Sequence, residues 1–120
     1  MNYRIDTTIR FGKELKRLSK KYKSIKQDYA HLLKELHNNP TTGINLGDGF
    51  HKMRMAITSK NRGKSHGARV IFYLYIINEA EGEIILLSIY DKQEKDNISE
   101  TELRQLKAEI KAYLGISERT

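Results

Sequence analysis

The sequence contains no cysteine, only one proline and no long apolar run. Without cysteine, neither a disulfide framework nor a thiolate metal site can form, which fits a reducing compartment. The longest apolar stretch, Val70–Ile77, is far too short to span a bilayer. The N-terminal residues also lack the apolar core of a signal peptide. We therefore expect a soluble, cytoplasmic protein with no membrane partner.

Acidic residues are missing from the middle of the chain. The whole protein carries a net charge of +7, and no Asp or Glu occurs between Asp48 and Glu79. That segment nevertheless holds six cations: Lys52, Arg54, Lys60, Arg62, Lys64 and Arg69. Because they have no acidic neighbour in sequence, we expect them to face solvent or an anionic partner, with nucleic acid as the leading candidate.

Several familiar site patterns are absent as well. We find no glycine-rich phosphate loop, no metal-ligand spacing and no Ser-His-Asp arrangement, so no metal and no cofactor is expected. Internal repeats and linkers are also lacking. At 120 residues and 14.0 kDa, the chain has the length of a single domain spanning residues 1–120.

The hydrophobic periodicity predicts an α+β fold. Residues 3–9 alternate like a strand, and the pattern then changes to helical spacing in two segments that end near Pro40. These two amphipathic helices should form a hairpin that packs on a twisted, mainly antiparallel sheet. "TTGINLGDG" (residues 41–49) is rich in turn residues, so we interpret it as a connector.

The second half predicts an antiparallel meander and a final helix. Residues 51–57 alternate between apolar and charged side chains, residues 70–77 form a fully apolar strand, and residues 84–90 form another. Ser99 and Glu102 have the spacing of a capping box, and Gly115 follows the last helical turn. The expected order is β-α-α-β-β-β-α.

This strand order would gather cations at one end of the sheet. Lys52 and Arg54 lie two apart on one strand face, Arg69 begins the next strand, and Tyr90 and Lys92 leave the last one. Each also has an ordinary interpretation, because the wet face of a half-exposed sheet is often charged. The hairpin residues Lys60, Arg62, Lys64 and His66 form either a solvated tip or a phosphate clamp.

A second run of cations lies at the junction between the two expected helices. "KKYKSIK" contains Lys20, Lys21, Lys23 and Lys26. Such a run is usually a solvated helix junction. Together with the sheet it would widen a phosphate-binding surface.

"GDGFHKMRMAITSKNRGKSHGARVIFYLYI" followed by "ILLSIYDKQEK" resembles the RelE/ParE superfamily of bacterial toxins, and within it the HigB-type branch. The likeness covers a basic K-x-R strand, a lysine- and glycine-rich hairpin, a G-x-R entry into an apolar strand and an "LL-x-IY-x-K-x-E" ending. His66 stands where a second glycine is common. The resemblance implies the RelE-like fold and a toxin that cuts messenger RNA in the ribosomal A site, restrained by a cognate antitoxin protein.

The resemblance also implies roles for individual residues. Lys52 and Arg54 match the basic pair of the family, Arg69 the arginine that opens the next strand, Tyr90 and Lys92 the C-terminal catalytic region, and Lys60 and Lys64 the basic hairpin. Metal-free cleavage by the ribose 2′-OH needs a base, a cation for the phosphorane and an acid. Lys52 or Lys64 is the candidate base, because neighbouring like charges favour the neutral amine. Arg69 suits the phosphorane with support from Arg54, and Tyr90 or Lys92 is the candidate acid.

Two other functions remain compatible with the sequence. The first is inhibition of DNA gyrase by the same fold, as in ParE-like toxins, which needs no convergent phosphate site. The second is a nucleic-acid-binding module without enzymatic activity, for which a salt-dependent basic surface is enough. Cleavage of a message on the ribosome would separate the expected function from both.

Overall fold

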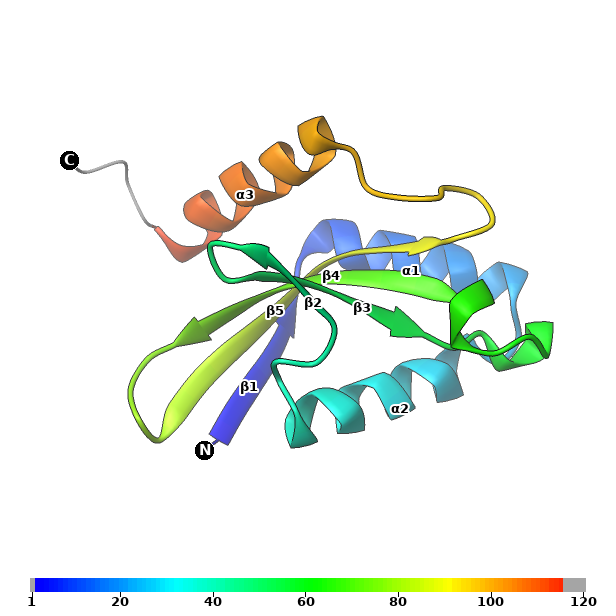
Figure 1. Cartoon of the computed structure of the whole chain (residues 1–120), viewed down its shortest axis with the longest axis horizontal. Coiled ribbons are helices and arrows are strands. Elements are labelled where there is room, and N and C mark those ends of the chain that lie inside the picture. The colour runs from blue at the N-terminus through cyan, green and yellow to red at the C-terminus, as the bar shows by residue number, and fades with distance from the viewer. Residues whose placement is uncertain (1, 116–120) are drawn as a thin grey trace.

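A computed structural model of the chain describes residues 2–115 and consists of one sheet with helices on both of its faces (Figure 1). The elements in chain order are β1 (Asn2–Thr7), α1 (Ile9–Lys21), α2 (Ile25–Asn38), β2 (Ile44–Gly47), β3 (Phe50–Met55), the 3-10 turns η1 (Thr58–Lys60) and η2 (Lys64–His66), β4 (Ala68–Ile76), β5 (Glu81–Asp91) and α3 (Glu100–Leu114).

The five strands form a single sheet in the order β1-β5-β4-β3-β2. Strands β3, β4 and β5 are antiparallel neighbours, so the predicted meander is confirmed. β1 pairs in parallel with β5, which places the N-terminal strand beside the last one. The α+β fold with a mainly antiparallel sheet is therefore the observed architecture.

Several strand boundaries differ from the sequence expectation: β3 is Phe50–Met55 rather than 51–57, β4 is Ala68–Ile76 rather than 70–77, and β5 is Glu81–Asp91 rather than 84–90. The connector contains the short strand β2, which the turn-rich pattern did not predict and which pairs with the free edge of β3. The first strand ends at Thr7 rather than Ile9, because the Thr8 side chain accepts a hydrogen bond from the Phe11 backbone N–H at 3.1 Å and caps α1. At β2 and at Thr8, hydrogen bonds that satisfy backbone groups override the local side-chain pattern.

The two faces of the sheet have separate apolar cores. On one face, α1 and α2 pack against the sheet through a cluster that includes Phe11, Leu18, Leu32, Leu36, Val70 and Phe72. On the other face, α3 packs through Leu106 and Ile110 against Phe50, Ile71 and Ile85. The predicted helical hairpin is thus confirmed as the cover of one face, with α3 on the opposite face.

α3 begins and ends where the sequence predicts. Ser99 accepts from the Glu102 N–H at 3.1 Å, and the Glu102 side chain accepts from the Ser99 N–H at 3.1 Å. These reciprocal bonds satisfy two N–H groups that the first helical turn leaves unpaired. Gly115 terminates the helix in the left-handed conformation with φ of 68°.

A β-bulge in the central pair of strands decides which face Tyr90 occupies. The register between β4 and β5 shifts opposite Ile71 and Phe72. Leu87 lies in the α3-side cluster, Ile89 lies in the α1/α2 cluster, and Tyr90 is again on the α3 side. An extra residue in one strand reverses the alternation beyond it. The bulge therefore brings Tyr90 to the same face as Arg69.

Glu14 of α1 stabilises this bulge from the opposite face. Its carboxylate accepts from the Ser88 hydroxyl at 2.9 Å and from the Ile89 N–H at 3.3 Å. Burial raises the pKa of Glu14, partly offset by these hydrogen bonds. The irregular backbone is therefore paired rather than left with unsatisfied polar groups.

Candidate functional site

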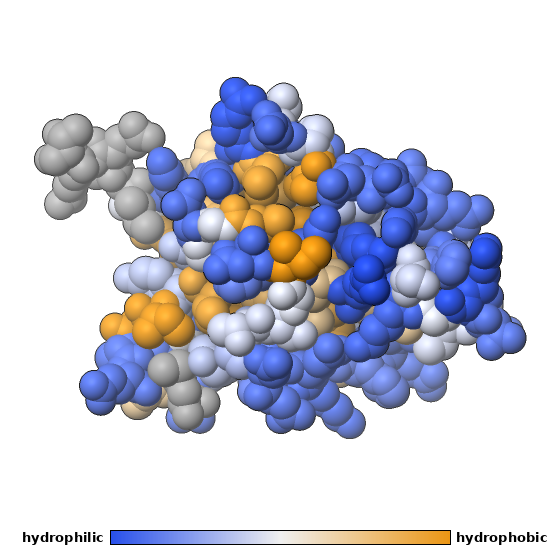
Figure 2. All heavy atoms as spheres, in the orientation of Figure 1, coloured by the Kyte–Doolittle hydropathy of each residue, from blue (hydrophilic) through white to orange (hydrophobic). Residues whose placement is uncertain are grey.

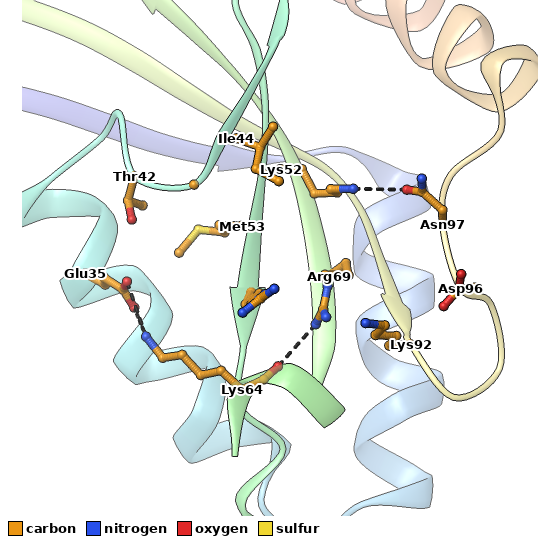
Figure 3. Close-up of a pocket in the computed structure, with 12 residues that line it drawn as sticks. Glu35, Thr42, Ile44, Lys52, Met53, Lys64, Arg69, Lys92, Asp96 and Asn97 are labelled. Carbon is orange, nitrogen blue, oxygen red and sulfur yellow. Dashed lines mark hydrogen bonds and ion pairs between the residues drawn. The ribbon is translucent and has the colours of Figure 1, made fainter. Parts of the chain in front are cut away.

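An open cavity of about 560 Å³ lies at the end of the sheet that α3 leaves uncovered, and its lining reaches from the α3-side cations past β3 to α2 (Figure 3). It opens between β3, the end of α2, the η2 turn and the segment that leads from β5 to α3. Its lining residues are Glu35, Thr42, Gly43, Ile44, Lys52, Met53, Arg54, Lys64, Arg69, Lys92, Asp96 and Asn97. Five of them are cations that come from four separate chain segments.

Strand register brings the central cations together. Arg54 of β3 is the direct partner of Arg69 on β4, and Arg69 is the partner of Tyr90 on β5. Directly opposed residues on neighbouring strands project from the same face. The expected convergence of Lys52, Arg54 and Arg69 at one end of the sheet is thus what the pairing produces.

Arg69 is buried, with 5% of its surface exposed, and holds the η2 turn. Its guanidinium donates to the Lys64 carbonyl at 3.2 Å and to the Ser65 carbonyl at 3.1 Å. Within residues 2–115 it makes no ion pair, and burial together with the charge of Arg54 lowers the pKa of Arg69. A buried cation without a counter-charge costs free energy, so this one is suited to an anion that binds from outside.

Gly67, two residues before Arg69, lies where the backbone of β3 leaves no room for a side chain. A Cβ atom on Gly67 would lie 2.2 Å from the Met55 carbonyl oxygen of β3. The Gly67 carbonyl also accepts the Lys92 backbone N–H at 3.1 Å. The close approach of three backbone segments here sets Lys92 beside the start of β4.

Two lysines of the cavity are held by partners on its opposite walls. Lys64 reaches toward α2 and pairs with Glu35 at 3.2 Å, while Lys52 donates to the Asn97 side chain at 3.0 Å (Figure 3). Arg54 and Lys92 have no side-chain hydrogen bond or ion pair with the described part of the chain. The cavity therefore holds both tethered and free cations.

Tyr90 does not line this cavity. Only 4% of its surface is exposed, and its ring packs in the cluster beneath α3, with the Lys95 ammonium 4.8 Å from the ring centroid. Its hydroxyl is buried without a hydrogen-bond partner among residues 2–115, and burial raises its pKa. The bulge places Tyr90 on the same face as Arg69, but α3 covers it.

Lys60 differs most from the expectation that the central cations face solvent or an external anion. Its side chain is 9% exposed, and its ammonium donates to Asp91 at 2.7 Å and to the His66 carbonyl at 2.9 Å. Burial alone would raise the pKa of Asp91, but the hydrogen bonds from Lys60 and Tyr22 outweigh it and the pKa is lowered. Lys60 has no acidic neighbour in sequence, and the tertiary structure provides Asp91 as its partner.

The remaining basic residues lie around the cavity rather than in it. Arg62 and His66 are exposed on the η1–η2 loop. At the α1–α2 junction Lys20, Lys23 and Lys26 are exposed, and Lys21 pairs with Glu94 at 3.2 Å. The junction contacts the loop, because the Ser59 N–H donates to the Ser24 hydroxyl at 2.9 Å. These cations therefore extend the basic surface beyond the cavity.

Sequence reasoning missed several polar residues of this region. Glu35, Asp96 and Asn97 line the cavity, and Asp91 anchors its supporting loop. Glu35 carries no distinguishing signal, since it is one of several charged residues on the polar side of a helix. For Asp91, the position immediately after a continuous apolar strand was the available sign of a buried acid.

The chain matches a known protein family over most of its length. The family model described as the RelE toxin of the RelE/RelB toxin-antitoxin system matches residues 9–120. The chain belongs to the RelE toxin family. The match extends well beyond the motif region around residues 47–95 and includes both helices of the hairpin.

Solved structures of E. coli RelE share the fold of this RelE-family protein. The isolated E. coli RelE toxin superposes with a TM-score of 0.54 at 16% identity, covering 89% of this chain and 98% of that one. A double arginine-to-alanine mutant of E. coli RelE in the free state gives a TM-score of 0.53 at 16% identity, covering 80% and 90%. At this identity the likeness concerns the fold.

Within residues 2–115, no helix is both long enough and apolar enough to cross a bilayer.

Proposed function

We propose that this RelE-family toxin is an endoribonuclease that cuts messenger RNA in the ribosomal A site and thereby stops translation. The observation that carries the proposal is the open cavity with five cations from four chain segments, centred on a buried arginine that lacks an ion-pair partner. A phosphodiester backbone is the anion that such a set of groups recognises best. We also propose that this toxin belongs to the HigB-type branch of the superfamily.

The reaction we propose is attack of the ribose 2′-OH on the adjacent phosphorus. The O2′–P bond forms, the P–O5′ bond breaks, and the products are a 2′,3′-cyclic phosphate and a free 5′-OH. Arg69, supported by Arg54, stabilises the negative charge that grows on the phosphorane oxygens. These two guanidiniums stay charged throughout and need no metal ion for this task.

The proton transfers are assigned to lysines. Lys52 lines the cavity, and its ammonium makes a single hydrogen bond, to the Asn97 side chain. Because this one bond leaves the ammonium able to turn toward a 2′-OH, Lys52 is our candidate base. Lys64 is paired with Glu35, so we assign it mainly to electrostatic attraction of the RNA and only as the second candidate for the base. Of the two candidate acids for the leaving 5′ oxygen, we favour Lys92 over Tyr90, because Lys92 lines the cavity and the Tyr90 hydroxyl is buried.

The partners follow from the same proposal. The ribosome would hold the message in line for attack, which is worth up to roughly 7–11 kcal/mol when orientation is fully realised. The exposed cations Lys20, Lys23 and Lys26 would contact ribosomal RNA outside the cavity. A cognate antitoxin protein would keep the toxin inactive until translation is to be stopped.

The test is 5′-end mapping of a short message in a reconstituted bacterial translation system. Reactions contain ribosomes with the protein, ribosomes without the protein, or the protein with ribosomes omitted. New 5′ ends at A-site codons that require ribosomes support the proposal. An intact message with normal translation rejects it and favours gyrase inhibition, or RNA binding without cleavage, which a DNA-supercoiling assay and a filter-binding assay distinguish.

A further inference from the structure

A second, separate cavity of about 360 Å³ opens beside the first. Lys92 and Asp96 line both cavities, so the two share a wall. The other lining residues belong to the η1–η2 loop and to the segment after β5: Lys60, Arg62, Ser65, His66 and Gln93. None of the proposed base and phosphorane-binding residues reaches this second cavity.

The floor of the second cavity is fixed by buried polar contacts. Asp91 is fully buried and binds the Lys60 ammonium, the Tyr22 hydroxyl and the Gln93 N–H. Lys60 in turn binds the His66 carbonyl at 2.9 Å. Arg69 holds the same turn from the other side through the carbonyl of Ser65. This loop is therefore a built surface and not a freely solvated hairpin tip.

The groups that face the second cavity are left available. The Arg62 side chain is exposed and makes no hydrogen bond or ion pair with residues 2–115. His66 contacts the Arg62 carbonyl at 3.2 Å and the Ser65 hydroxyl at 3.0 Å through Nδ1, so Nε2 is its free nitrogen. Lys92 adds a third cationic or polar donor. These groups match the charge of one further phosphate.

The cavity also has an acceptor. Asp96 repels a phosphate but accepts a hydrogen bond from an amino group, and Gln93 beside it offers both a donor and an acceptor. A free inorganic anion would use only the cations. A nucleotide, with a phosphate at one end and a base edge at the other, uses the whole set.

We infer that the second cavity is a subsite for the nucleotide next to the one that is cut. This inference rests on the proposed function, because it assigns the neighbouring segment of the same RNA. Arg62 and His66 bind its phosphate, Asp96 and Gln93 contact its base, and Lys92 lies between the two phosphates. By binding this nucleotide, the η1–η2 loop determines which phosphodiester of the message lies in the first cavity, where the bond breaks.

The experiment measures binding of short, uncleavable RNA analogues to the full chain. The probes are 2′-fluoro oligonucleotides of two and four nucleotides, which lack the attacking hydroxyl, titrated at low salt. For wild type we expect the four-nucleotide probe to bind about tenfold more tightly, since a charged hydrogen bond is worth about 1.5–3 kcal/mol. Arg62→Ala, alone and with His66→Ala, should abolish most of this gain and leave binding of the two-nucleotide probe unchanged.

Salt dependence gives a second readout. Each phosphate contact on a single strand contributes about 0.7 to the slope of log affinity against log salt. Arg62→Ala should lower the slope for the long probe by about that amount and leave the slope for the short probe unaltered. Arg104→Ala is the matched control, because Arg104 is an exposed arginine on α3 that lines neither cavity, and it should behave as wild type.

The outcomes separate this inference from the proposed function. A length gain that survives in both Arg62 variants, or that is absent in wild type, overturns the subsite even when ribosome-dependent cleavage is intact. Loss of the gain in both variants, with an unchanged melting temperature, supports the subsite. Cleavage on the ribosome is measured in parallel with wild type, so a protein that binds RNA at both cavities without cutting it rejects the proposed function alone.

Discussion

One face of one sheet carries two contrasting surfaces. Along β3, Phe50 lies in the apolar cluster under α3, whereas Lys52 and Arg54 project from the same face into the open cavity. Figure 2 shows the contrast, with hydrophobic residues gathered beneath α3 and hydrophilic ones over the end that carries the η1–η2 loop. The six-residue strand β3 thus contributes both to the apolar core and to the cavity. The position of α3 decides which of its residues are covered and which remain open.

The two ends are also stabilised by different forces. The covered end depends on burial of apolar side chains, which is nondirectional and tolerates small changes of shape. The open end depends on buried charge and on backbone contacts, such as the pair Lys60–Asp91 and the grip of Arg69 on the η2 turn. We therefore expect substitutions at the open end to be costlier and to affect function first.

The largest effect is expected from Asp91→Ala at the open end. It leaves the Lys60 ammonium buried without its carboxylate, which should lower the free energy of unfolding by about 3–5 kcal/mol. Urea unfolding at neutral pH measures the loss. The double variant Lys60→Met with Asp91→Leu should recover much of it, because an apolar pair removes the unpaired charge. Equal losses in the single and double variants would contradict this assignment.

The same pair predicts a pH dependence of stability. The folded pKa of Asp91 is lowered, so its contribution is fully present above the unfolded value of about 3.9 and is lost as pH falls through the lower, folded value. The difference in unfolding free energy between wild type and Asp91→Ala should therefore be constant from neutral pH to about pH 5 and shrink in stronger acid. A difference that grows on acidification would refute the assignment.

Next in size is Arg69→Ala, which tests the open end directly. Loss of the buried guanidinium should slow ribosome-dependent cleavage by about 10²–10³-fold, as expected for removal of one group that stabilises transition-state charge. Arg69→Lys should restore little, because a single ammonium cannot hold the Lys64 and Ser65 carbonyls and also face a phosphate. Arg104→Ala serves again as the control. Undiminished cleavage by a folded Arg69→Ala protein would remove Arg69 from the mechanism.

A smaller effect at the covered end sharpens the comparison. Ile110→Val removes one methylene beneath α3 and should lower the unfolding free energy by about 0.5–1.5 kcal/mol. Cleavage per folded molecule should stay at the wild-type value, because Ile110 belongs to the apolar cluster beneath α3 and does not line the cavity. A fall in cleavage at full folding would show that α3 packing and the open end are coupled.

The smallest effect is expected from Glu35→Gln. The pair Glu35–Lys64 is exposed and worth about 0.2–1 kcal/mol, so stability should hardly change. Removing the carboxylate frees Lys64 and should raise affinity for the short 2′-fluoro probe by about twofold to fivefold. The gain should disappear at high salt, where exposed charges are screened. Weaker binding by this variant would instead make Glu35 part of the RNA contact.

Much of the fold was predictable because the signals are local. Helical spacing places α1 and α2, the capping box places the start of α3, and an uninterrupted apolar run marks β4 as a central strand. The charged face of β3 is likewise visible as alternation, so Lys52, Arg54 and Arg69 could be expected to meet once the meander was assumed. Strand β2 escaped prediction, since its four residues are too few for their alternation to stand out among the turn formers that surround them.

The site itself was only partly predictable. Tyr90 lies on the same face as Arg69 because of a bulge that no local pattern predicts, and α3 buries its hydroxyl. Lys60 was expected to be a free cation and is instead paired with an acid 31 residues away. Such pairings depend on the path of the whole chain and on which groups lose water together, so no window of neighbouring residues contains them.

The sequence alone determined the element types, the basic middle segment and the family motifs, because periodicity, charge and turn chemistry act over a few residues. Tertiary structure decided the parallel pairing of β1 with β5, the end of the sheet that α3 leaves open, and the partners of Lys60 and Lys64. The physical reason is that burial and charge pairing depend on which groups are close in space, and the partners here are far apart in sequence, by 31 residues for Lys60 and Asp91 and by 29 for Lys64 and Glu35.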